Sequence, residues 1–152
     1  MAPIFFQKMP FLAKPVHKKL FGKHKTWRGL LLAPLMSIIV FWLQKVAFSN
    51  GFTSWALIDY ADFSLLLGFL LGAGAILGDL VKSYYKRKGG LAPGERWIPF
   101  DQVDFIIGGL VLSWFVYVPS AKVVLILLIA GFFLQIIFKY LGFVLKLSDV
   151  KM

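Results

Sequence analysis

Four polar side chains stand at helical spacing where a long apolar run ends, in the stretch "GDLVKSYYKRK". Asp79 is followed by Lys82, Ser83 and Lys86, which are three, four and seven residues further along the chain. Residues at these separations share one face of an α-helix, so a continuing helix would align a carboxylate, a hydroxyl and two ammonium groups. A carboxylate in an apolar helix is costly without a partner, and Asp79 is therefore a candidate functional residue.

A second pair of carboxylates follows a segment that is rich in helix breakers. The segment "KGGLAPGERWIP" carries three glycines and two prolines, which favour a turn back toward the apolar part of the chain. The stretch "FDQVDF" then places Asp101 and Asp104 three residues apart. If a helix begins there, these two carboxylates share one of its faces.

Three carboxylates on the two sides of a turn can converge with water and phosphate oxygens around a hard cation such as Mg²⁺. Neighbouring lysine and arginine side chains would then neutralise a triphosphate, as nucleotidyl transfer requires, because its catalysis is mostly positioning and electrostatics. The sequence thus predicts a metal site of Asp79, Asp101 and Asp104. A structural interpretation stays open, in which Asp79 pairs with Lys82 or Lys86, Asp101 caps a helix and the basic loop only sets the topology.

A second basic cluster, "GKHKTWRG", precedes the first long apolar run. Its Lys25, Thr26 and Arg28 lie between two glycines, where the backbone can come close to a phosphate. A solvated topology signal is the alternative interpretation of the same residues.

Four apolar runs approach the roughly 20 residues that a helix needs to cross a hydrocarbon core of about 30 Å. The third is short and needs residues 98–100 or a locally thinned bilayer to span. With 59% hydrophobic residues, the sequence predicts an all-α, polytopic integral membrane protein with a single domain, residues 1–152. The four runs extend from about Leu30 to Phe48, Phe63 to Val81, Phe105 to Val118, and Val123 to Leu145.

The formal net charge is +10, and the basic residues gather on alternate connections between these runs. Only Lys45 and Lys122 fall on or near the other two connections. The positive-inside rule then places both termini, the basic segment 1–29 and the loop 82–104 on the cytoplasmic side of the cell membrane. In a membrane, such bases favour anionic lipid headgroups or a polyphosphate ligand over nucleic acid. The absence of cysteine excludes disulfides and thiolate metal sites.

The second apolar run also contains "GFLLGAGAILGDL", in which Gly68 and Gly72 form a GxxxG pair. Small residues at this spacing let two helix backbones approach closely, so we expect a helix-packing face there. Gly108 and Gly109 in the third run favour the same interpretation.

Taken together, these motifs resemble the CDP-archaeol synthases, the archaeal-type branch of the phosphatidate cytidylyltransferase superfamily. The resemblance rests on "GDL", "SYYKR", "PGE" and "DQVD", which occur in this order after "HKTWRG", and it covers the chain from about Pro10 to the C-terminus. The bacterial and eukaryotic branch has Asp-Arg-x-Asp where this chain has "DQVD". That difference is typical of the archaeal branch.

The resemblance implies a membrane enzyme that joins CTP to a lipid phosphate with the help of Mg²⁺ and releases pyrophosphate. The archaeal branch implies the ether lipid 2,3-di-O-geranylgeranylglyceryl phosphate as the substrate. In the implied reaction, the lipid phosphate attacks the α-phosphorus of CTP in line, without a covalent enzyme intermediate. The implied residue roles are metal binding by Asp79, Asp101 and Asp104, catalysis by these three and Lys86, and CTP or phosphate binding by Lys25, Thr26, Arg28, Ser83, Lys86 and Arg87.

Members of the family commonly have a further hydrophobic helix ahead of Lys-Thr-x-Arg-Gly, and "MAPIFFQKMPF" resembles only the end of such a helix. We therefore expect either that one N-terminal helix is missing from this sequence or that this member is naturally short. Three other functions stay open: a CDP-diacylglycerol synthase acting on phosphatidic acid, a small ion-coupled transporter and a non-catalytic scaffold. The sequence also leaves open whether the protein forms a homo-oligomer among the membrane lipids.

Overall fold

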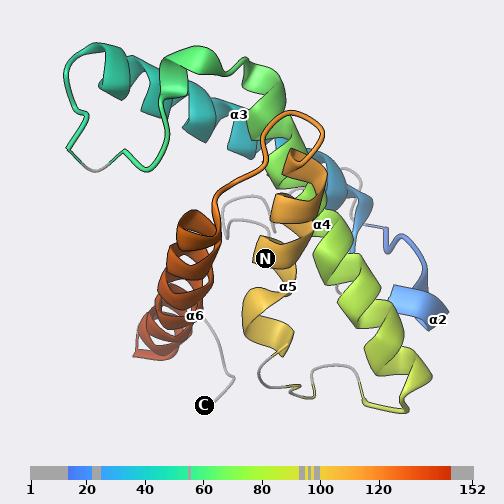
Figure 1. Cartoon of the computed structure of the whole chain (residues 1–152). Coiled ribbons are helices and arrows are strands. Elements are labelled where there is room, and N and C mark those ends of the chain that lie inside the picture. Colours follow the sequence, from blue (N-terminus) through green and yellow to red (C-terminus); the bar gives the residue numbers. More distant parts are fainter. Residues whose placement is uncertain are drawn as a thin grey trace.

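The fold is a set of helices joined by loops (Figure 1). The computed structural model describes residues 14–21, 25–54, 56–92, 95, 97 and 100–144. Within these ranges there is no strand, and only an isolated bridge joins Pro15 and Thr26. The predicted all-α fold is therefore confirmed. In chain order the elements are α2 (Lys18–Phe21), α3 (Trp27–Ser49), the 3-10 turn η1 (Tyr60–Asp62), α4 (Leu65–Lys88), α5 (Phe100–Ser113) and α6 (Ala121–Val144).

Some of the predicted features lie outside the described residues. These are the N-terminal stretch 1–13, the C-terminal residues 145–152 and, with them, both predicted cytoplasmic ends. The turn residues Pro93, Gly94 and Pro99 also lie outside.

Three helices in the described ranges are long and apolar enough to cross a membrane: Trp27–Ser49, Leu65–Lys88 and Ala121–Phe138. They contain the first predicted apolar run and most of the second and fourth. Of the third run, only residues 105–113 are helical: they belong to α5, which begins at Phe100, ends at Ser113 and has only 14 residues. At 1.5 Å per residue, such a helix is about 21 Å long, which is shorter than the roughly 30 Å hydrocarbon core.

Side-chain caps and glycines set the ends of the two helices that precede the site. Thr26 caps α3 by accepting a hydrogen bond from the N–H of Gly29 at 3.4 Å, and Ser64 caps α4 by accepting one from Leu66 at 3.3 Å. Helix α4 ends only at the Gly89–Gly90 pair, where Gly90 has a φ of 77° that glycine adopts without strain. The first part of the predicted loop 82–104, up to Lys88, is therefore helical.

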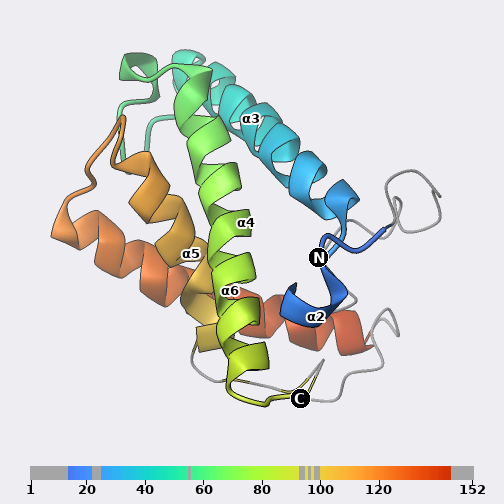
Figure 2. The ribbon, with the colours of Figure 1, turned by 90° about the vertical axis from the view of Figure 1, so that its right-hand side faces the viewer.

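Helix α4 is the central element, since it packs against α5 most extensively and then against α3 (Figures 1 and 2). Helix α6 packs against α5, and Figure 2 shows it running steeply across the direction of α4. The predicted GxxxG face is confirmed, because it lies against α3: a Cβ at Gly68 would stand 2.6 Å from Cβ of Phe41, and one at Gly72 would stand 2.5 Å from Cβ of Ser37.

A second pair of glycines on α4 brings its backbone against that of α5. A Cβ at Gly74 would lie 2.3 Å from the carbonyl oxygen of Gly108, and a Cβ at Gly108 would lie 2.2 Å from the carbonyl oxygen of Gly74. A Cβ at Gly78, one turn further along, would lie 2.2 Å from the carbonyl oxygen of Asp104. Only glycine permits this approach, and the approach places the residue after Gly78 beside the start of α5.

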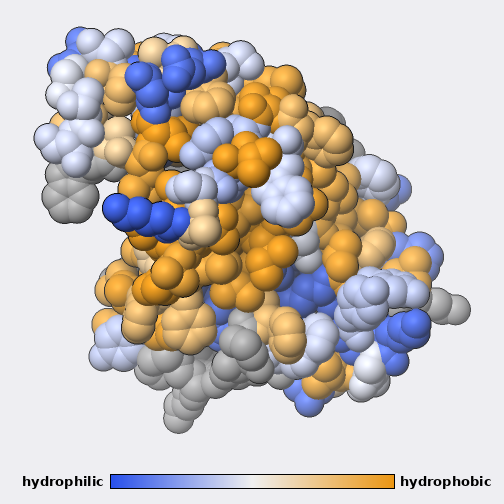
Figure 3. All heavy atoms as spheres, viewed as in Figure 1, coloured by the Kyte–Doolittle hydropathy of each residue, from blue (hydrophilic) through white to orange (hydrophobic). Residues whose placement is uncertain are grey.

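The surface is mostly apolar, as a lipid-facing protein requires. Among the described residues, the buried hydrophobic side chains are those of Phe41, Leu67 and Leu110, whereas Phe115 is 81% exposed and Val118 is 70% exposed. Figure 3 shows apolar side chains over most of the middle of the molecule, with hydrophilic ones gathered mainly toward two edges. This distribution fits a membrane protein whose polar chemistry lies near one end of its helices.

Candidate active site

Three carboxylates from α4 and α5 surround the ammonium group of Lys82. Its Nζ lies 3.0 Å from Oδ1 of Asp79, 3.3 Å from Oδ1 of Asp101 and 2.9 Å from Oδ2 of Asp104. We call these three aspartates, with Lys82 between them, the aspartate cluster. The prediction that residues on the two sides of the turn converge is confirmed. The alternative pairing of Asp79 with Lys82 is observed as well.

The other oxygen of Asp79 pairs with Lys25, which comes from the segment before α3. Backbone hydrogen bonds hold this segment against residues 14–16: the N–H of Val16 donates to the carbonyl of Lys25 at 2.8 Å, and the N–H of Trp27 donates to that of Lys14 at 3.2 Å. Lys25 and the aspartate cluster, more than fifty residues apart in sequence, therefore meet at one site.

Lys86 pairs with Asp101, not with Asp79. Its ammonium group lies 3.0 and 3.1 Å from the two carboxylate oxygens of Asp101, and it also donates to the carbonyl of Glu95. Lys86 is only 7% exposed. A buried lysine needs such partners, because an uncompensated charge away from water is strongly destabilising.

Asp101 is the most extensively bonded carboxylate of the cluster. Its Oδ2 also accepts a hydrogen bond from the backbone N–H of Trp97 at 2.7 Å. Burial alone would raise the pKa of Asp101, but the Trp97 N–H and the neighbouring ammonium groups outweigh it, so the pKa of this carboxyl lies below its ordinary value. Asp101 is therefore an anion at neutral pH.

Helix α6 reaches the cluster through Gln135, which sequence reasoning missed. Its Nε2 donates to the backbone carbonyl of Asp101 at 2.9 Å. The signal was present, since Gln135 is an isolated polar residue in a long apolar run, and such residues usually face a partner. The sequence predicts Lys82 as part of a helical face and as a possible partner of Asp79, but not its place between all three carboxylates.

In the described part of the chain, no three histidine, cysteine, aspartate or glutamate side chains stand ready to hold a metal ion. The three carboxylates instead face the Lys82 nitrogen at 2.9–3.3 Å, a longer distance than the roughly 2.0–2.1 Å between Mg²⁺ and its oxygen ligands. The cluster is therefore arranged around an ammonium group, and its donor set is nonetheless one that hard cations prefer.

Three other predicted site residues lie near the cluster in different settings. Ser83 is buried, and its hydroxyl donates to the carbonyl of Asp79 at 2.7 Å within α4. Thr26 uses its side-chain oxygen to cap α3. Arg28 is half-buried in the first turn of α3. No phosphate contact follows from these positions alone, so their predicted roles stay predictions.

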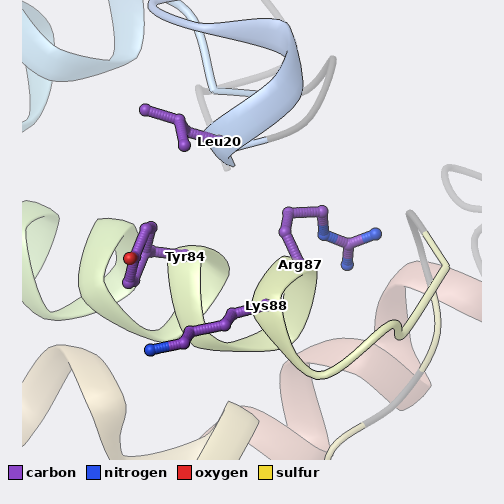
Figure 4. A pocket seen from close by; sticks show the side chains of 4 residues that line it. All are labelled: Leu20, Tyr84, Arg87 and Lys88. Atoms are coloured by element: carbon purple, nitrogen blue, oxygen red, sulfur yellow. The ribbon is translucent and has the colours of Figure 1, made fainter.

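Arg87 lies elsewhere around α4, as its spacing from Asp79 predicts. Its guanidinium donates to the carbonyl of Ala92 at 3.0 Å, and its side chain lines a cavity of about 300 Å³. Figure 4 shows this cavity, to which α2 contributes Leu20 and the end of α4 contributes Tyr84, Arg87 and Lys88. The side chains of the adjacent residues Lys86 and Arg87 thus lie in different environments, Lys86 in contact with Asp101 and Arg87 beside the cavity.

Comparison with known proteins identifies the relatives of this chain. The CDP-archaeol synthase of Methanospirillum hungatei is 28% identical over 139 residues, which cover 88% of this chain and 81% of the relative. Those of Pyrococcus furiosus and Thermofilum pendens are 31% and 33% identical over 115 and 135 residues. These matches cover 74% and 88% of this chain but only 64% and 59% of the two relatives.

The chain thus spans about three fifths of the length of these last two relatives. No solved structure matches it. The CarS-like family model, described as CDP-archaeol synthase, matches residues 13–152, a range that includes both the Lys25 segment and the whole aspartate cluster. In agreement with the motifs in its sequence, the chain belongs to the CDP-archaeol synthase family.

Proposed function

We propose that this protein is a nucleotidyltransferase that moves a cytidylyl group from CTP to a membrane lipid phosphate. The products would be CDP-archaeol and pyrophosphate, and the lipid substrate would be 2,3-di-O-geranylgeranylglyceryl phosphate. Family membership supports the reaction, since the curated relatives bear the name CDP-archaeol synthase. The protein would act in phospholipid biosynthesis.

The single observation that carries the proposal is the aspartate cluster at the junction of α4 and α5. It gathers three carboxylates and the ammonium groups of Lys25, Lys82 and Lys86 near the end of helices that are otherwise apolar. A charged nucleotide can meet such a site from water, while a lipid tail lies against the apolar helix surfaces. The basic residues around it favour a site on the cytoplasmic face of the cell membrane.

Mg²⁺ is part of the proposal. Its fit is supported by the donor set, because three carboxylates from two helices already face a single cationic group. Asp79, Asp101 and Asp104 would hold the ion. When bound, it would screen the repulsion between the lipid phosphate and the triphosphate of CTP.

In the proposed step, a lipid phosphate oxygen forms a bond to the α-phosphorus of CTP, and the bond from that phosphorus to the bridging oxygen of the β-phosphate breaks. The electron pair leaves with pyrophosphate. Lys86 would stabilise the charge that develops on the phosphates, and Arg87 would bind CTP. Lys25, Thr26, Arg28 and Ser83 would bind CTP, so that binding energy positions the reacting groups.

The test is an assay of purified protein in detergent with labelled CTP, Mg²⁺ and the geranylgeranyl ether lipid phosphate. We expect labelled CDP-lipid and pyrophosphate from the wild type. We expect Asp104→Asn to lose activity by about two orders of magnitude or more, because it removes a charge from the cluster. Asp62→Asn is the matched control, since Asp62 lies in η1 on the connection between α3 and α4.

Two further arms separate the competing functions. Faster turnover of phosphatidic acid than of the ether lipid would replace CDP-archaeol synthesis by CDP-diacylglycerol synthesis. If neither lipid is converted by the chain or by a version extended upstream of Met1, the cytidylyltransferase proposal is wrong. Ion-coupled flux into proteoliposomes without CTP would then favour the transporter.

A further inference from the structure

We propose that Lys82 is the resident cation of the aspartate cluster and that its side chain must leave before a divalent cation can bind there. The inference rests on the proposed function, because it assigns a metal to the same carboxylates. It adds a residue to that function: Lys82 would control when the site is able to accept metal.

The position of the ammonium group carries the first step. Lys82 reaches one oxygen of each aspartate, at 3.0, 3.3 and 2.9 Å, and so occupies the point on which the three carboxylates converge. A metal held by the same oxygens would need that point. Since the ammonium group and the ion would also repel each other at contact distance, the two cannot occupy the cluster together.

The remaining partners of the aspartates explain why the site would survive this exchange. Lys25 holds the second oxygen of Asp79, while Lys86 and the Trp97 N–H hold Asp101. These contacts do not involve Lys82. The carboxylates of Asp79 and Asp101 would therefore stay in place while the lysine side chain, on its flexible four-carbon stem, turns away.

The charge balance of the cluster indicates that a divalent ion replaces Lys82 and is not simply added to it. Three carboxylates face three ammonium groups, those of Lys25, Lys82 and Lys86, so the cluster is balanced without a metal. A divalent ion can bind only where it displaces one of these ammonium groups, and that of Lys82 is the one that contacts all three carboxylates. Only the fraction of molecules with Lys82 displaced is able to bind metal, which weakens the apparent affinity by that same fraction.

The first experiment measures Mn²⁺ binding to purified protein in detergent, without nucleotide, by electron paramagnetic resonance. We expect Lys82→Met to bind Mn²⁺ with a Kd about tenfold or more lower than that of the wild type, since every molecule would be competent. Lys82→Arg keeps a cation in the cluster and should bind as weakly as the wild type. Lys122→Met removes an exposed lysine at the start of α6 and should change nothing.

The second experiment uses the wild type alone, so it does not depend on the folding of a variant. The protein is treated with an amine-acetylating reagent, with and without Mn²⁺, and the modification of each lysine is measured by mass spectrometry. Lys82 is 15% exposed in its side chain, and we expect Mn²⁺ to increase its modification several-fold as the ammonium group leaves the cluster. The modification of Lys122 should stay constant.

The outcomes separate this inference from the proposed function. If the wild type makes CDP-lipid and Asp104→Asn does not, but Lys82→Met binds Mn²⁺ no more tightly and Mn²⁺ leaves Lys82 modification unchanged, the inference is overturned and the function stands. If no variant binds Mn²⁺ at all, both the metal assignment and the inference are wrong. Tighter binding by Lys82→Met in a protein that makes no CDP-lipid would support the inference and reject the function.

Discussion

A Cβ on Gly78 of α4 would lie 2.2 Å from the backbone carbonyl oxygen of Asp104 on α5. This is a contact between two backbones, and a side-chain rotation cannot relieve it. Asp79 and Lys82 lie on α4 with Gly78, so the packing of the two helices also decides how near the carboxylate of Asp104 on α5 comes to them. Packing and chemistry therefore depend on the same glycine.

We expect Gly78→Ala to destabilise the protein and to abolish CDP-archaeol synthesis, because the added methyl group must push α5 away from α4. Overpacking of this kind costs about 1–3 kcal/mol, which corresponds to a Tm lower by roughly 2–12 °C in a chain of this size. Thermal unfolding in detergent and the CTP assay measure the two effects. The control is Gly89→Ala, where the nearest atom to the new Cβ is the Tyr85 carbonyl oxygen at 3.4 Å.

Much of this arrangement could be predicted from the sequence. Hydrophobic run length predicted the long helices, and the spacing of Asp79, Lys82 and Lys86 predicted one polar helix face. The glycine breakers after Lys88 predicted the turn that returns Asp101 and Asp104 to the cluster. These signals are local, since each depends on the periodicity or the turn chemistry of a short segment.

The features of the site that could not be predicted from the sequence depend on contacts between segments that are far apart in the chain. Whether the three carboxylates face a metal or a lysine is decided by where the Lys82 side chain lies once α4 and α5 are packed. Likewise, the pairing of Lys86 with Asp101 rather than Asp79 requires the position of α5. The shortness of α5 follows from its start at Phe100 and its end at Ser113, which apolar composition alone does not mark.

Lys86 should matter for both stability and turnover. It is buried and contacts both carboxylate oxygens of Asp101, so Lys86→Met would leave that carboxylate with one partner fewer. Breaking a buried pair costs about 3–5 kcal/mol, and loss of a charge at the phosphates would lower kcat by about a hundredfold. The matched control is Lys122→Met, which removes an exposed lysine of α6. Wild-type stability and kcat in Lys86→Met would reject both roles.

Gln135 offers a test of how α6 supports the site. Gln135→Leu keeps the size of the side chain but removes the hydrogen bond to the Asp101 carbonyl, so we expect a loss of about 1 kcal/mol and a several-fold lower kcat. Gln44→Leu makes the same change at an exposed position of α3 and should have little effect. Thermal unfolding and steady-state kinetics distinguish the pair. Identical behaviour of the two variants would mean that α6 does not orient Asp101.

Arg87 should affect the binding of CTP more than its conversion. It lines the cavity beside Leu20, and the structure shows no contact between its side chain and the aspartates among the described residues. We therefore expect Arg87→Ala to raise the KM for CTP about tenfold with kcat changed by less than about twofold, the pattern of a group that binds substrate and transition state equally. Arg87→Lys, which keeps a positive charge, should recover part of the loss. A large fall in kcat with an unchanged KM would instead place Arg87 on the leaving pyrophosphate in the transition state, and the cavity would then lie outside the path of CTP.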